Sequence, residues 1–317
     1  MSLAPGGGSS LRCVVIGDLN NDTNLDIILA NYGTNNIGVL FGYGNGSFEN
    51  QMMLSTGMNS HPISIAVGDF NGDRVVDIAV ANLGTKHVDM MLGNGQENFA
   101  IQTSYEIGFD RPPLVMASGD FNNDARSEIA VAYDGRDHVD IFVPYNSGSF
   151  ETETRFSVGP FPRSVSIGDV NNDTRLDIIV ANWESNYVSV LLGYGNGSFE
   201  TETRYTVGSS PRSVAIGDVN NDTRLDIVIA NSRSSDYTDE NHCPPDHETN
   251  LDIVNHIYIY TTQIANNVTN YFPNVTELTF SQYYDALDHL TTNAFNRIFP
   301  VSQLAKLTIY TNQRYRI

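Results

Sequence analysis

Apolar runs of five or six residues recur along residues 8–231 and alternate with short clusters of Gly, Asn and Asp. In the best-preserved stretch, one run ends at Asp169 and the next three cover 176–181, 187–192 and 201–207. Runs rich in Val and Ile that are bounded by turn residues predict strands joined by tight turns. The apolar spacing of an amphipathic helix is absent from this stretch. We therefore expect units of four antiparallel strands.

The strands of one unit differ in polarity. The second strand, which begins at Asp177, is apolar on both sides, whereas the fourth alternates polar and apolar residues. Buried inner strands with a wettable outer strand are typical of a propeller blade. Gly193, Gly195 and Gly197 are expected to supply positive φ in the turn between the third and fourth strands. A phenylalanine closes this turn in four units and is expected to plug the space between neighbouring units: Phe48, Phe99, Phe150 and Phe199.

An acidic stretch that follows the first strand marks the repeat. Its copies begin at Asp18, Asp69, Asp120, Asp169 and Asp218, in steps of 51, 51, 49 and 49 residues. A fixed period of this size predicts a repeat architecture in which each unit is one supersecondary element. The sequence shows four full units and half of a fifth, because the pattern departs after Asn231. The expected fold class is therefore mainly β, with four full propeller blades and a partial fifth.

The rest of the chain has a different composition. We expect residues 1–7 to be a disordered N-terminus, residues 8–231 the propeller repeats, and residues 232–250 a linker rich in Ser, Asp, Glu, His and Pro. Residues 251–317 alternate strand-like and helix-like segments and resemble the strand-helix coils of leucine-rich-repeat proteins. This expected α/β segment has strands at 257–260, 275–280 and 304–309 and helices at 262–271 and 286–299.

The acidic stretch has the chemistry of a calcium loop. Oxygen-bearing side chains stand at positions 1, 3, 5 and 9, and the main-chain carbonyl of position 7 adds a further ligand. An all-oxygen set with three negative charges suits a hard cation of flexible coordination, calcium before magnesium, and lacks the nitrogen and sulfur that zinc and copper prefer. Up to five Ca²⁺ ions are expected. The candidate ligands are Asp18, Asn20, Asp22, Asn24 and Asp26; Asp69, Asn71, Asp73, Val75 and Asp77; Asp120, Asn122, Asp124, Arg126 and Glu128; Asp169, Asn171, Asp173, Arg175 and Asp177; and Asp218, Asn220, Asp222, Arg224 and Asp226.

Two alternatives compete with this interpretation. An EF-hand needs a bidentate Glu at position 12, where all five copies carry an aliphatic residue, and it needs flanking helices. An Asp-rich and Asn-rich turn that caps the strands with its own hydrogen bonds needs no ion. Five copies with the same oxygen-bearing positions favour calcium over this second alternative. Glu128 has a longer side chain than the Asp of the other units, so we expect the third site to be the weakest.

The run from Val214 to Asn231, preceded in the array by the glycine turn at 192–199, resembles the FG-GAP/VCBS repeats of integrin-α-like β-propellers. The resemblance covers residues 8–231. It implies that each unit is a four-stranded blade, that the loop between the first two strands binds calcium, and that the protein is an extracellular or cell-surface glycoprotein for adhesion or recognition. This sequence departs from the family at loop position 6, which is usually glycine, and in showing fewer units than the common seven blades. The residues at position 6 are Thr23, Arg74, Ala125, Thr174 and Thr223.

The resemblance favours a binding module over an enzyme, with an unidentified protein or glycan as its ligand. Some polysaccharide lyases and phospholipases are similar to this repeat family, so an enzyme remains the alternative, as does a purely structural array. Candidates for catalysis are isolated: His61, His87 and His138 fall in different units, and Lys86 and Arg111 stand alone. In the linker, His242, Cys243 and His247 form a weak metal-binding pattern.

Charge narrows the choice of partners. The chain has 17 Lys and Arg against 37 Asp and Glu, a net charge of −20, which disfavours nucleic acid and anionic membranes as partners and favours cations.

No apolar run reaches the roughly 20 residues that span a bilayer, and residues 1–10 contain no signal segment. Cys13 and Cys243 are compatible with one bridge or, as we favour, with two thiols. Of seven N-x-Ser/Thr triplets, the four outside the acidic loops are plausible glycan acceptors: Asn45, Asn196, Asn267 and Asn274.

Overall fold

The computed structural model describes residues 8–105, 111–145, 149–207, 210–218, 223–231, 256–260, 277–282 and 306–311. Four consecutive four-stranded antiparallel sheets follow the chain order, as expected for propeller blades. The first blade contains β1 (Leu11–Gly17), β2 (Asp26–Asn31), β3 (Asn36–Leu40) and β4 (Met52–Ser55), with the short 3-10 turn η1 (Tyr32–Thr34) after β2. The second contains β5 (Pro62–Gly68), β6 (Asp77–Asn82), β7 (His87–Gly93) and β8 (Phe99–Tyr105). The third contains β9 (Pro113–Gly119), β10 (Glu128–Tyr133), β11 (His138–Tyr145) and β12 (Ser149–Ser157), and the fourth β13 (Pro162–Gly168), β14 (Asp177–Asn182), β15 (Tyr187–Leu191) and β16 (Thr203–Thr206).

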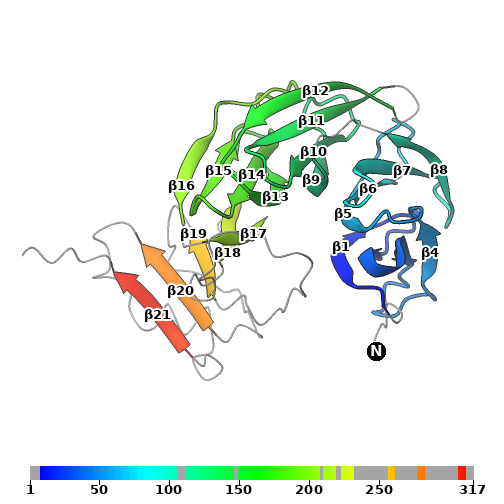
Figure 1. Cartoon of the computed structure of the whole chain (residues 1–317), viewed down its shortest axis with the longest axis horizontal. Coiled ribbons are helices and arrows are strands. Elements are labelled where there is room, and N and C mark those ends of the chain that lie inside the picture. The colour runs from blue at the N-terminus through cyan, green and yellow to red at the C-terminus, as the bar shows by residue number, and fades with distance from the viewer. Residues whose placement is uncertain are drawn as a thin grey trace, which may run out of the picture.

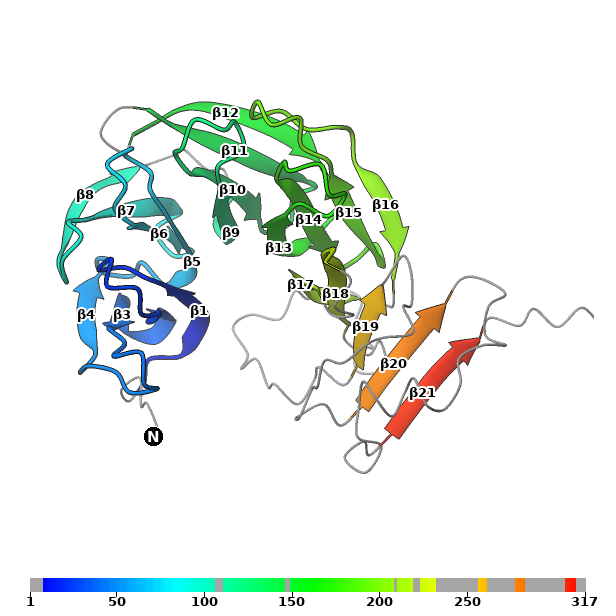
Figure 2. The same ribbon diagram turned by 180° about the vertical axis from the view of Figure 1, so that it is seen from behind.

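The blades stand side by side along an arc (Figure 1). The first strand of each blade contacts the first strand of the next, so β1, β5, β9, β13 and β17 (Pro211–Gly217) form the inner side of the array. Figure 2 shows the same arc from behind, with the later strands of each blade on its outer side. The mainly β fold class and the propeller blades expected from the sequence are confirmed.

The fifth sheet begins like the others and then changes. Its first strands, β17 and β18 (Asp226–Asn231), pair as in every blade, and β19 (His256–Tyr260) pairs antiparallel with β18. Asn231 lies opposite His256 just as Asn182 lies opposite Tyr187 in the fourth blade. The strand at 256–260 therefore occupies the place of a third blade strand, although it follows a long interruption of the repeat.

Two further strands extend the fifth sheet in parallel. β20 (Glu277–Gln282) pairs parallel with β19, and β21 (Lys306–Thr311) pairs parallel with β20. Parallel neighbours require a crossover connection of a dozen or more residues. The three strands expected in this part of the chain are therefore present. The expected helices at 262–271 and 286–299, the N-terminal residues 1–7 and the linker at 232–250 lie outside the described residues.

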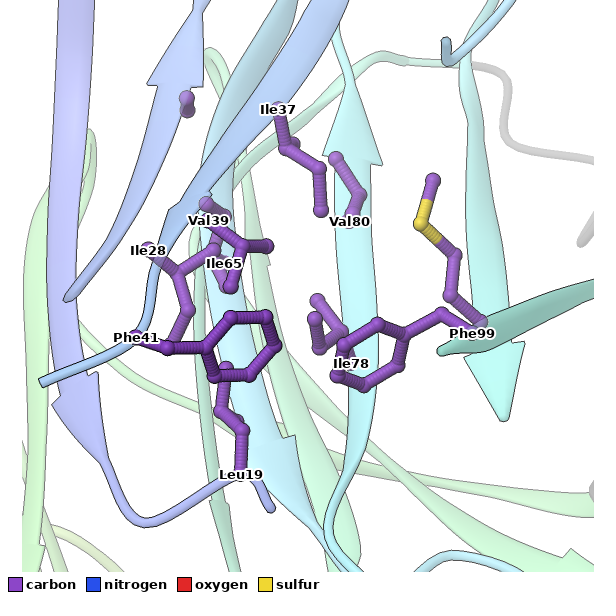
Figure 3. Close-up of a cluster of buried hydrophobic side chains, with 11 residues drawn as sticks. Leu19, Ile28, Ile37, Val39, Phe41, Ile65, Ile78, Val80 and Phe99 are labelled. Carbon is purple, nitrogen blue, oxygen red and sulfur yellow. The ribbon is translucent and has the colours of Figure 1, made fainter. Parts of the chain in front are cut away.

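The hydrophobic core lies between neighbouring blades. Figure 3 shows the junction of the first two blades, where Phe41 and Leu19 from the first blade pack with Phe99 and Ile78 from the second. At the junction of the third and fourth blades, the Phe199 ring packs edge-on against Phe121, with ring centroids 5.3 Å apart. The prediction that these phenylalanines plug the space between units is confirmed for Phe99 and Phe199, whereas the side chain of Phe150 is outside the described set.

Burial within the fourth blade follows the predicted order of strands. All six residues of β14 are buried, because sheets of the neighbouring blades cover both of its faces. All four residues of β16 are exposed, so both faces of the outer strand contact solvent. Its alternating sequence pattern had indicated that only one face would do so. Gly195 and Gly197 have the expected positive φ of 71° and 81°.

Gly193 has a different role from the one expected. Its φ is not among the positive values, and a Cβ at this position would lie 2.2 Å from the carbonyl oxygen of Leu176. Gly42 stands equally close to the carbonyl oxygen of Leu25 in the first blade. These glycines are needed because the end of the third strand approaches the backbone of the acidic loop, which leaves no room for a side chain.

Candidate metal centres

The position-1 carboxylate holds each acidic loop in a tight curl. In the fourth blade, Asp169 Oδ1 accepts the backbone N–H of Asp173 at 2.9 Å, and Oδ2 accepts the backbone N–H of Thr174 at 2.7 Å. Asp18, Asp69 and Asp120 accept the equivalent pairs in the first three blades. The loop thus wraps around this carboxylate, which brings the side chains of positions 1, 3 and 5 to the same side of the turn.

Positions 3 and 5 are linked to each other. Asn171 Oδ1 accepts the backbone N–H of Asp173 at 3.0 Å, while Asn171 Nδ2 donates to Asp173 Oδ2 at 3.1 Å. Such bonds are those of the ion-free Asp and Asn turn, so both interpretations of the sequence share this geometry. A carboxylate oxygen has more than one acceptor site, and Asp173 is exposed. These bonds therefore leave it able to bind a cation.

Position 9 has a structural role that the sequence did not reveal. Asp177 is fully buried; its Oδ2 accepts the backbone N–H of Val170, and its Oδ1 accepts that of Gly193, each at 2.9 Å. Asp26 and Asp77 accept the corresponding two N–H groups in their blades. The carboxylate therefore ties the acidic loop to the end of the third strand. The sequence did contain one signal of this role, a glycine 16 residues after the position-9 acid. This glycine marks the point where the end of the third strand meets the acidic loop.

Among the described residues, three carboxylates converge in the third loop. Oxygen atoms of Asp120, Asp124 and Glu128 all lie within 4.8 Å of one another. Glu128 Oε2 accepts the backbone N–H of Phe121 at 2.7 Å, and Oε1 accepts Asn122 Nδ2 at 2.9 Å. The longer Glu side chain thus reaches toward positions 1 and 5. The expectation that the third site is the weakest stays a prediction.

The buried acids are costly to ionise without a cation. Burial, together with the neighbouring carboxylates of the loop, raises the pKa of Asp77 to about 6 and that of Glu128 to about 7, although backbone N–H groups oppose the shift. Burial likewise raises the pKa of Asp26 and Asp177. A bound cation would favour the charged forms, because an opposite charge lowers the pKa of a carboxyl.

Position 6 of the loop takes a left-handed backbone conformation without glycine. The φ of Thr23 is 72°, that of Arg74 is 67°, that of Ala125 is 68°, and those of Thr174 and Thr223 are 68° and 69°. A left-handed residue other than glycine costs roughly 1–2 kcal/mol. The loop therefore keeps its turn against the local preference of these residues. Strain of this kind persists where the surrounding hydrogen bonds determine the conformation.

The fifth loop is described in part. Asp218 Oδ2 accepts the backbone N–H of Thr223 at 2.8 Å, which is the bond that curls the other loops, and Asp226 is buried. Asn220 and Asp222 lie outside the described residues. The first four loops, by contrast, are described at every candidate ligand position.

The isolated candidates for catalysis remain apart. His61 stacks on Tyr32, with ring centroids 4.6 Å apart. His87 Nε2 lies 3.3 Å from Asp89 Oδ1, and His138 Nε2 lies 3.7 Å from Asp140 Oδ2, each within its own blade. Lys86 is in the loop after β6, and Arg111 is exposed before β9. The structure therefore does not gather these side chains into one site.

Of the two cysteines and the linker motif, the structure describes Cys13. Cys13 is half-buried, and burial raises the pKa of its thiol. Cys243, His242 and His247 lie outside the described residues. Both alternatives for the cysteines thus remain predictions.

An aromatic and basic cluster lies at the ends of the strands opposite the acidic loops. Trp183 follows β14, and the Cζ atoms of Arg163 and Arg212 lie 5.6 and 5.8 Å from the centroid of its ring. Phe161 approaches the Trp183 ring at 6.4 Å. Trp183 Nε1 and Arg212 Nε are buried and have no hydrogen-bond partner among the residues that the structure describes. The sequence analysis missed this cluster, because Arg212 reaches the Trp183 ring from the next sheet and no local pattern pairs the two residues.

The FG-GAP-like repeat model matches residues 18–80, 120–180 and 169–229, which together make up more than half of the chain. A search of curated proteins finds no match. Among solved structures, the chain is similar to virginiamycin B lyase from Staphylococcus aureus, with a TM-score of 0.50 and 14% identity over 71% of this chain and 64% of that one. A lectin from Agrocybe aegerita, which recognises non-reducing terminal N-acetylglucosamine, has a TM-score of 0.48 and 18% identity over 69% of this chain and 60% of that one.

The chain spans less than two thirds of the length of these two structures. At such identities the likeness to the lyase shows the fold alone. Within the described residues, no helix is long and apolar enough to cross a membrane.

Proposed function

Because the chain belongs to the FG-GAP-like repeat family, we propose that this propeller-like module binds calcium in its acidic loops and recognises a protein or glycan outside the cell. The observation that carries the calcium proposal is the convergence of carboxylates in the loops, closest at Asp120, Asp124 and Glu128. Positions 1, 3, 5 and 9 and the carbonyl of position 7 would hold the ion in each blade. Calcium suits these oxygen donors better than magnesium, because calcium tolerates irregular and higher coordination.

Calcium would serve the fold and not a reaction. It would offset two of the three negative charges of each loop and fix the loop against the end of the third strand. An ion in every blade stabilises the blades, whereas a single substrate would need one distinctive site. His61 and His87 belong to the second blade, and not to different units as expected, whereas His138 belongs to the third; each lies beside a partner of its own. These contacts favour a binding module over an enzyme.

The calcium proposal predicts a characteristic dependence on pH. Without calcium, the folded-state pKa values of Asp77 and Glu128, about 6 and about 7, exceed the ordinary values of 3.8 and 4.5. The folded state then binds more protons than the unfolded state, so these acids make stability fall as pH rises from about 4 to 7. With calcium, the charged forms are favoured, so the gain in melting temperature from calcium grows over the same range. Thermal melts in EDTA and in calcium at pH 4.5, 6 and 7.5 measure both trends, with magnesium as the control ion. A calcium gain that stays constant across these pH values would contradict the proposal.

We further propose that recognition takes place on the face opposite the acidic loops. The support is the Trp183 cluster, where two arginines flank one aromatic ring and two buried polar atoms have no partner in the described part of the chain. Buried donors without partners cost free energy unless a ligand or water accepts from them. Amphipathic aromatic rings and arginines are also the residues that dominate recognition surfaces.

Trp183→Ala is expected to weaken binding to the cognate ligand at least tenfold, since hot-spot aromatic residues contribute about 2 kcal/mol or more. The measurement is a binding screen on immobilised glycans and extracellular proteins with the calcium-loaded wild type, repeated with the variant. Tyr194→Ala is the matched control, because Tyr194 is 48% exposed at the acidic-loop end of the same blade. A ligand that is lost with Tyr194→Ala and kept with Trp183→Ala would place recognition on the other face.

An extracellular location agrees with these proposals. Asn45 and Asn196 are exposed in the glycine turns, where a glycan would leave the sheets undisturbed. Extracellular modules commonly bind calcium with modest affinity, which matches loops that carry exposed ligands.

A further inference from the structure

The junctions between blades differ in how their space is filled. At the junction of the third and fourth blades, the ring of Phe199 packs against Phe121 and against Phe156, with centroids 5.3 and 5.2 Å apart. Phe121 is the second residue of the acidic loop. Phe156 lies opposite Val139 in the outer strand. The plug is therefore an aromatic ring held between the loop and the outer strand of the preceding blade.

The next junction has the same walls but a different filling. By repeat position, Val170 corresponds to Phe121, and Tyr205, which lies opposite Val188, corresponds to Phe156. Both residues line a pocket of about 290 Å³ between the fourth and fifth blades. After Asn231, the sequence has no further copy of the Gly-Asn-Gly-Ser-Phe turn that supplies Phe199 to its blade.

The walls of the pocket are suited to an aromatic ring. Val170, Val190, Leu192, Tyr205, Leu225 and Ile227 provide most of the lining. Val170 also replaces the larger Leu19, Phe70 and Phe121 of the first three loops, which widens the space. Asn171, Arg224 and Asp226 supply polar groups at the acidic-loop end. Apolar walls with a few polar groups at one end are the usual form of a ligand site.

We propose that this pocket binds an aromatic side chain of a partner protein. The partner's ring would take the position that Phe199 takes at the preceding junction, and the partner's backbone would meet Asn171 and Arg224 at the polar end. The inference goes beyond the recognition face proposed above, because the pocket lies between blades and has residues of the acidic loops at one end.

The probe is N-acetyl-phenylalaninamide, with N-acetyl-leucinamide as the comparison, added to the full chain in calcium and followed by saturation-transfer NMR. The expected Kd for the phenylalanine probe is on the order of 1 mM, with clearly weaker binding of the leucine probe. Val170→Phe fills the pocket from within. It should abolish probe binding and raise the melting temperature, because a buried ring replaces a smaller side chain beside an open space.

Two further variants complete the test. Leu25→Phe adds a ring on the first blade, where Leu25 is 60% exposed, and should leave probe binding unchanged. Tyr205→Ala removes one wall and should weaken the probe severalfold while the chain stays folded, since Tyr205 lies on the exposed outer strand. The proposal is overturned if the wild type does not bind the phenylalanine probe or if Val170→Phe binds it undiminished. It is also overturned if Val170→Phe lowers the melting temperature, which would mean that the chain itself already fills the space.

Discussion

Asp177→Ala is expected to lower the free energy of unfolding by about 3 kcal/mol in EDTA, and by more in calcium, because position 9 is also a proposed ligand of the ion. The two oxygens of this fully buried carboxylate accept the backbone N–H groups of Val170 and Gly193. Each buried N–H left without an acceptor costs about 1–3 kcal/mol. Part of this cost is offset because ionising a buried carboxylate is itself unfavourable, as the raised pKa of Asp177 indicates. Urea unfolding of the variant and the wild type measures the loss.

Asp173→Ala is the matched control for this prediction. Asp173 belongs to the same loop but is exposed, so in EDTA its removal should change stability by no more than about 0.5 kcal/mol. The two acids should thus differ in the absence of any ion. Equal stability of the two variants in EDTA would show that position 9 does not brace the loop.

Asp169→Ala combined with Asp173→Ala is expected to remove part of the stability that calcium adds. The variant lacks two of the three carboxylates of the fourth loop, so that loop can no longer hold the ion. A site that binds calcium at about 100 times its Kd contributes roughly 2.7 kcal/mol, so the loss should be of this order while the other loops keep their share. Thermal or urea unfolding of the variant and the wild type, in calcium and in EDTA, gives the difference.

Arg175→Ala serves as the control within the same loop. Position 7 is expected to contribute its carbonyl oxygen, which the substitution retains, and the Arg175 side chain is exposed. The calcium gain of this variant should therefore equal that of the wild type. If the double variant also kept the full gain, calcium would be stabilising the protein somewhere other than in the acidic loops.

Local features of this molecule were predictable from its sequence. The period of the acidic stretch and the apolar runs give the four-stranded blades, because strand polarity and turn residues act over short distances. The interblade role of Phe199 was predictable as well, since the residue follows a glycine turn in each of four units.

Features that depend on contacts between distant segments were not predictable. Gly193 looked like a turn residue, but its role is set by the carbonyl oxygen of Leu176, a neighbour only in three dimensions. The pairing of β19 with β18 crosses an interruption of the repeat and has no local signal. For the same reason the Trp183 cluster escaped notice, because Arg163 and Arg212 reach one ring from two blades.

Direct titration of calcium tests the central claim, which is that the acidic loops of the blades are calcium sites. Isothermal titration calorimetry of chelator-treated protein at pH 7.5 should show saturable binding of more than one and up to five calcium ions, with magnesium binding more weakly. The melting temperature should rise over the same range of calcium concentration. If no calcium binding is detected and the melting curve is the same in EDTA and in calcium, the loops are ion-free turns.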